Sequence, residues 1–158
     1  MTNYKLEKYL SNLDHFSQEI SKLATIIKND LPMFSPPDDL HQHVADMHQH
    51  VCVMISGAHS ATDQIRTASK QHASQTTQEV VAKTFLVQKE LWRELYEMAA
   101  PLRGNLGKIH VGLLFMSITE ALGSSHDSLE KMGTLGNEYI QSMSEPPGTN
   151  WFSKLFKK

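Results

Sequence analysis

The stretch HQHVADMHQHVCVM, residues 41–54, decides the fold, because a seven-residue unit, HQHVADM, is followed by a near copy, HQHVCVM. Residues three and four apart share one face of an α-helix, and a strict heptad favours packing against other helices. Apolar residues keep this spacing on both sides of the stretch and fill two slots of the heptad. One slot holds Leu40, Met47, Met54, Ala61 and Ala68, and the other holds Val44, Val51, Ala58, Ile65 and His72. The sequence therefore predicts a long helix with one apolar stripe.

The same spacing predicts a first helix over residues 3–28. Its apolar residues recur every three or four positions: Leu6, Tyr9, Leu13, Phe16, Ile20, Leu23 and Ile27. Pro32 follows soon after this pattern stops, and proline cannot donate a helical hydrogen bond. The start of the second helix is predicted at Ser35-Pro36-Pro37-Asp38. Serine suits the N-cap, proline suits the first turn, and aspartate suits the positive end of the helix dipole.

A turn near residues 73–76 is predicted from a change of register. The apolar residues that follow the repeat, Val80, Thr84, Val87, Leu91 and Met98, are one position out of phase with it. Thr76–Glu79 also has the pattern of a capping box, in which the first and fourth side chains satisfy free amides. We therefore expect a separate third helix that ends before Pro101.

The fourth helix is predicted over residues 108–143, with apolar residues in register through Gly123 and Ser124. Its most apolar part, Ile109–Ile118, is too short to cross a bilayer, so it is interpreted as a buried segment. Gly133 and Gly136 follow no strand, which argues against a phosphate-binding loop, and they indicate close contact between helices.

Four helices with short connections predict an all-α, up-down helical bundle with coiled-coil-like heptad seams over residues 1–144. A Pro/Gly linker, residues 145–150, and a short tail, residues 151–158, complete the chain. The second and fourth helices should be about 55 Å long and the other two about 35–40 Å. The longer pair would leave an apolar overhang, and a second copy usually covers such a surface, so a homodimer is expected.

Composition excludes several classes of protein. A formal charge of −2 over 158 residues argues against a nucleic-acid-binding protein, which would carry a basic patch. The single cysteine, Cys52, excludes an internal disulfide and suggests a reducing compartment such as the cytoplasm. The first ten residues lack the apolar core of a signal peptide.

Histidines flank the seam of the second helix on both sides, with His41 and His48 in one row and His43 and His50 in the other. They suggest either a pH switch, because imidazoles charge near pH 6.5, or a zinc or other transition-metal site that also uses Cys52 and His59. No two of the histidines have the four-residue spacing with which two imidazoles of one helix chelate a metal. The simpler interpretation is that half-exposed positions tolerate histidine.

Cys52 and His48 are also four residues apart, as in a nucleophile and its base. The sequence places no third orienting group and no oxyanion donor beside them, so a cysteine at the edge of the core is the better interpretation. No catalytic residues are predicted.

The tail is the most distinctive segment. A helical wheel places Trp151, Phe152, Leu155 and Phe156 on one side and Lys154, Lys157 and Lys158 on the other. Aromatic residues opposite a basic face are typical of an interfacial membrane anchor. The tail would otherwise dock into a groove of a partner protein or fold back on its own bundle.

These features favour a non-enzymatic helical interaction protein that is cytoplasmic and self-associating. It would need no cofactor and would dock through its tail to a membrane surface or a partner protein. The alternative is a helical bundle that binds a metal or another ligand through the histidines of the second helix.

Overall fold

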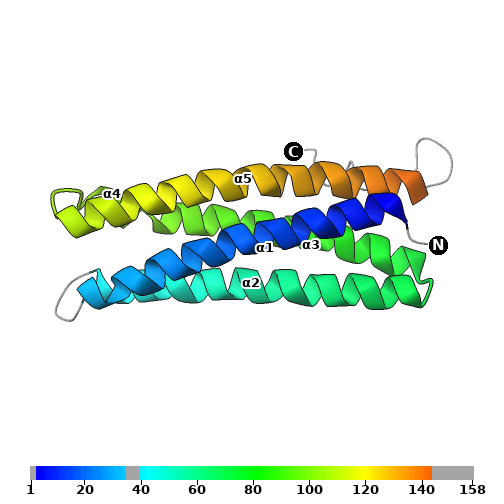
Figure 1. The fold of residues 1–158 in the computed structure, drawn as a ribbon, viewed down its shortest axis with the longest axis horizontal. Helices are drawn as coiled ribbons and strands as arrows, with labels where there is room; N and C mark the ends of the chain where they lie inside the picture. Colours follow the sequence, from blue (N-terminus) through cyan, green and yellow to red (C-terminus); the bar gives the residue numbers. More distant parts are fainter. Residues whose placement is uncertain (1–2, 35–39, 144–158) are drawn as a thin grey trace.

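The computed structural model describes residues 3–34 and 40–143, and these form four long antiparallel helices in an up-down-up-down bundle (Figure 1). The long helices are α1 (Tyr4–Asp30), α2 (His41–Lys70), α3 (Ser74–Met98) and α5 (Ile109–Met143). Two short elements, the 3-10 helix η1 (Leu31–Phe34) and helix α4 (Ala100–Arg103), lie at one end. The start of α1, the α2–α3 turn and the end of α5 lie together at the other end (Figure 1). The predicted all-α bundle is confirmed.

Helix α1 follows its predicted pattern closely. The Asn3 side chain accepts a hydrogen bond of 3.1 Å from the amide of Leu6, which caps the helix. Every apolar residue of the predicted stripe is buried, from Leu6 to Ile27. The helix packs along both α2 and α5, so its stripe forms the centre of the core.

Helix α2 buries both slots of the heptad as far as Ala68. The last residue assigned to a slot, His72, is instead exposed in the turn after α2, with a left-handed φ of 57°. The proposed start signal, residues 35–38, lies outside the described residues. At 30 residues α2 is about 45 Å long, shorter than expected.

The face that α3 turns to the core differs from the prediction. Its fully or largely buried residues include Val81, Phe85, Gln88 and Leu95, whereas Val87 is exposed. Gln88 is accommodated because its Nε2 donates a 3.1 Å hydrogen bond to the carbonyl of Met54 in α2. The turn also comes earlier than predicted, since α3 already begins at Ser74. Residues 76–79 therefore lie inside the helix.

Elements η1 and α4 close the end of the bundle at which they lie. Phe34 of η1 and Leu102 of α4 are both fully buried there, and the Phe34 ring meets the His110 ring edge-on at 5.1 Å. Helix α5 is about 52 Å long and continuous through Gly123 and Ser124. The core at this end is thus closed by the chain itself, whereas Leu106 and Ile109 stay exposed there.

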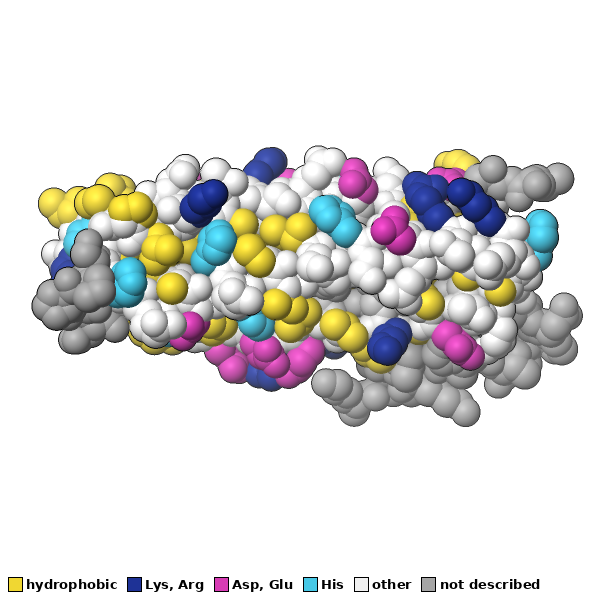
Figure 2. Space-filling view, turned by 90° about the horizontal axis from the view of Figure 1, so that it is seen from below, with side chains coloured by type: hydrophobic (Ala, Val, Ile, Leu, Met, Phe, Trp, Pro, Cys, Tyr) yellow, Lys and Arg dark blue, Asp and Glu magenta, His cyan; other side chains and the backbone are white. Residues whose placement is uncertain are grey.

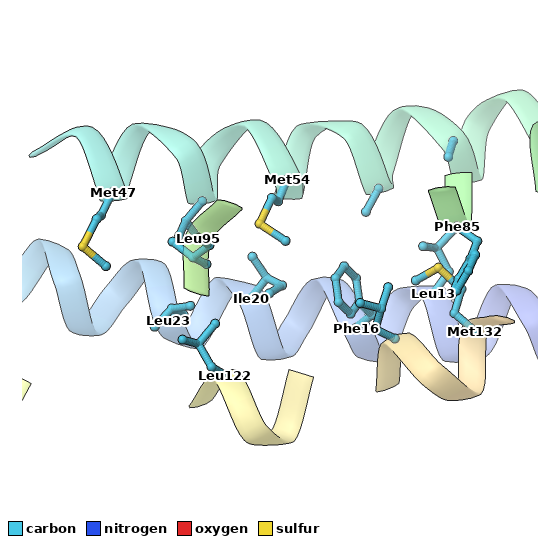
Figure 3. Packing of buried hydrophobic residues seen from close by; sticks show 14 of the residues in the cluster. Leu13, Phe16, Ile20, Leu23, Met47, Met54, Phe85, Leu95, Leu122 and Met132 are labelled. Carbon is cyan, nitrogen blue, oxygen red and sulfur yellow. The ribbon is translucent and has the colours of Figure 1, made fainter. Parts of the chain in front are cut away.

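The core runs along the whole bundle as one cluster. Figure 3 shows side chains from α1, α2, α3 and α5 meeting between the helices, among them Leu13, Ile20, Met54, Leu95 and Leu122. None of the described helices is both long and apolar enough to cross a membrane.

Two glycines of α5 allow α1 and α3 to pack closely against α5. A Cβ atom built on Gly133 would lie 2.8 Å from Cε1 of Phe85, and one on Gly136 would lie 3.1 Å from Cγ1 of Val81. The Tyr9 hydroxyl donates a 3.3 Å hydrogen bond to the Val81 carbonyl at the same crossing, and burial raises the pKa of this hydroxyl. Close helix contact, the interpretation favoured for these two glycines, matches this geometry.

Gly133→Ala should lower the free energy of unfolding by about 1–3 kcal/mol, because the added methyl overlaps the largely buried Phe85 ring. Gly123→Ala is the matched control in the same helix, since no described atom outside the local backbone of α5 lies within 4 Å of its Cβ position. That control should stabilise the protein by about 1 kcal/mol through helix propensity. Urea unfolding of both variants checks the prediction, and equal stabilisation would contradict the close packing at Gly133.

Candidate interaction surface

The first part of α5 exposes apolar side chains on the side opposite the core. Ile109, Leu113 and Met116 are 80%, 61% and 68% exposed, and Leu106, in the turn before the helix, is 47% exposed. On a helical wheel the three α5 residues fall within roughly 60° of one another. We call these four residues the α5 outer face. The prediction that Ile109–Ile118 is a buried segment is therefore wrong for this side of the helix.

An apolar groove of about 550 Å³ adjoins this face, between α3 and α5. The α3 side contributes Trp92, Tyr96 and Ala99, and the α5 side contributes Phe115, Leu122 and Gly123 among others. Because Ala99 and Gly123 are small, a hollow remains between the larger aromatic rings. Its volume is in the range of ligand pockets, at about 300–1,000 Å³.

The aromatic wall of the groove is held in place by polar contacts. The Trp92 indole Nε1 donates a 3.0 Å hydrogen bond to Oγ of Ser125, which itself donates to the Leu122 carbonyl at 3.0 Å. The Tyr96 ring stacks on Trp92 with centroids 5.7 Å apart, and the His126 ring lies 4.9 Å from Trp92 on the other helix. A wall fixed in this way loses little conformational freedom when a partner binds.

Charged groups line the groove and its edge. The Arg103 guanidinium lies over the Phe115 ring, 5.6 Å from its centroid, and Asp127 lines the groove with His126. His126 Nδ1 lies 3.4 Å from a carboxylate oxygen of Glu130. The Arg103, His126 and Trp92 side chains are thus engaged with neighbours of the same chain.

Two α2 histidines, His43 and His50, contact α3. Nε2 of His50 donates a 2.7 Å hydrogen bond to the Leu91 carbonyl and lies 3.9 Å from Oε2 of Glu94. His43 makes the equivalent contact with the Met98 carbonyl. His41 is half-buried, and its Nδ1 has no hydrogen-bond partner among the described residues. The row of His43 and His50 therefore faces the neighbouring helix of the same chain.

The remaining members of the predicted metal set do not converge. The Sγ atom of Cys52 lies 3.8 Å from Nδ1 of His48, and both Cys52 and His59 are exposed. Nowhere in residues 3–34 and 40–143 do three or more histidine, cysteine or acidic side chains come together as metal ligands would. Figure 2, which views the bundle from below, shows the histidines of that face as separate patches.

Replacing His41, His43, His48 and His50 by Gln separates the pH switch from the simpler interpretation that these positions tolerate histidine. The hydrogen bonds of His43 and His50 to α3 need a proton on Nε2. A charged imidazole also carries this proton, so protonation keeps both bonds. Glu94 lies beside His50 and would pair with its charged ring. We therefore expect wild type and variant to associate alike between about pH 7 and about pH 5.5 in sedimentation experiments. A loss of association on acidification in the wild type alone would establish the switch.

The tail residues Trp151–Lys158 lie outside the described residues, so their role stays a prediction. Comparisons of the chain with protein-family models, curated proteins and solved structures found no significant match.

Sequence reasoning missed both the groove and the α5 outer face. A signal was present: an amphipathic helix shows polar residues opposite its stripe, whereas Ile109–Ile118 has apolar residues on all sides. An all-round apolar pattern predicts burial, but a helix with an exposed interaction surface has the same pattern.

Proposed function

We propose that this chain is a non-enzymatic helical interaction protein that self-associates and docks through its C-terminal tail to a membrane surface or a partner protein. The observation that carries the proposal is the apolar side of the bundle, where the α5 outer face adjoins the groove between α3 and α5. Contiguous exposed apolar surface on a folded domain marks interaction sites, because covering it removes apolar area from water.

The character of the groove supports binding over catalysis. Rings and small apolar residues dominate its lining, and Trp92, Arg103 and His126 are held by contacts with their neighbours. The exposed Cys52 beside His48 has no third group to orient it among the described residues, unlike an activated nucleophile. A lone exposed cysteine also supports a reducing compartment such as the cytoplasm.

Two measurements on the full chain test the proposal. Sedimentation velocity from micromolar to submillimolar concentration should show a rising sedimentation coefficient if the chain self-associates. Co-sedimentation with anionic phosphatidylserine vesicles and with neutral phosphatidylcholine vesicles should show binding to the former. A protein that stays monomeric at every concentration and ignores both vesicle types would overturn the proposal.

A further inference from the structure

We infer that the α5 outer face is the surface on which a second copy of this chain docks, with the two α5 helices antiparallel across a two-fold axis near Leu113. The inference rests on the self-association proposed above and assigns it a surface, a partner and an orientation. Two observations support it: the apolar side chains of the face and the charged residues at its two ends.

The face offers one apolar row to a facing helix. Ile109, Leu113 and Met116 lie on the same side of α5 and are mostly exposed. Leu106 is the exposed apolar residue of the turn before the helix, and its carbonyl oxygen lies 3.4 Å from the Cβ position of Gly112. The larger side chains of such a row can interdigitate with those of a facing helix.

Charges at the ends of the face favour a second copy over other partners. Lys108 and Arg103 lie before the row, and Glu120 and Asp127 follow it. Parallel copies would bring like charges together, whereas an antiparallel pair brings Lys108 of each copy close to Glu120 of the other. The Glu120 carboxylate would then also lie near the positive N-terminal end of the facing α5. This self-complementarity is what a two-fold interface requires, because one patch must match itself.

The size of the face sets the strength of the contact. Four apolar residues, three on α5 and one in the preceding turn, make a smaller surface than a standard interface, which buries about 1,600 Å² in total. We therefore expect a reversible dimer with a dissociation constant in the micromolar range, and not a permanent assembly.

The first test removes the apolar contact. Leu113→Lys should weaken self-association of the full chain at least tenfold in sedimentation equilibrium, without changing helix content or the unfolding midpoint, because Leu113 is largely exposed. Val87→Lys is the matched control, since Val87 is an exposed aliphatic residue, 44% accessible, on α3. Val87→Lys should leave the dissociation constant unchanged.

The second test examines the orientation. Glu120→Lys and Lys108→Glu should each weaken the dimer, and the double variant should restore it, because the pair is exchanged across the two-fold axis. A weakened double variant would overturn the antiparallel register. Self-association that is insensitive to Leu113→Lys, or equally sensitive to Val87→Lys, would overturn this surface and leave the proposed function standing. A monomeric wild type would overturn this inference, and vesicle binding would then decide the docking role alone.

Discussion

Leu13→Asp or Ile20→Asp in α1 is expected to abolish the cooperative unfolding transition of the protein. Both side chains are fully buried at the centre of the core. Truncating a large core residue costs about 2–5 kcal/mol, and a carboxylate without a partner in such a site adds a desolvation cost. Because folded domains are stable by only about 5–15 kcal/mol, either change removes much or all of the margin.

Urea or thermal unfolding followed by circular dichroism measures this effect. Ser11→Asp is the control, because it places the same side chain at an exposed position of the same helix. The control should unfold within about 0.5 kcal/mol of wild type, as surface substitutions usually do. If Leu13→Asp instead melted like wild type, the packing of α1 at the centre of the bundle would be wrong.

Deletion of residues 151–158 is expected to remove binding to anionic vesicles while leaving helix content unchanged. Each lysine near an anionic surface contributes only about 1 kcal/mol, so the aromatic and aliphatic side chains of the tail must supply the rest of the attachment. Co-sedimentation of the full and shortened chains with phosphatidylserine vesicles gives the comparison, and circular dichroism reports the fold.

Substitutions within the tail separate the two contributions. Trp151→Ala combined with Phe156→Ala should reproduce most of the loss, whereas replacing Lys154, Lys157 and Lys158 should mainly reduce the salt sensitivity. Trp151 fluorescence should shift to the blue on adding vesicles, and the shortened chain supplies the Trp92 background. No shift, together with a lower melting temperature on deletion, would mean that the tail stabilises the bundle and does not bind membranes.

The fold class and three of the four long helices, α1, α2 and α5, follow from sequence because their apolar spacing is regular. In α1 each expected core position holds a large apolar residue, from Leu6 to Ile27, and all of them are buried. The register of α5 also holds through Gly123 and Ser124, where glycine alone would suggest a break. A long periodic pattern outweighs a single poor helix former, since tertiary packing supplies most of the stability of a helix.

The orientation of α3 did not follow from its sequence. Polar Gln88 is buried because it finds a carbonyl in α2, and apolar Val87 next to it is exposed. Hydropathy alone would bury Val87 and expose Gln88, which is the reverse of the structure. The groove was missed for the same reason, because it depends on which residues of α3 and α5 meet, and a one-residue error in register moves Trp92 and Tyr96 away from it.

The position of the α5 outer face along its helix has a consequence for how paired copies would be arranged. Met143, the last described residue of α5, lies about 45 Å along the helix from Leu113. In an antiparallel pair the two Met143 residues would therefore lie at opposite ends of the dimer, about 90 Å apart. Tails that start from such distant points suit a spacer between two surfaces better than a double anchor on one. The pair would then tether separate vesicles, and mixing the full chain with anionic vesicles should raise their turbidity while the Leu113→Lys variant binds them without clustering.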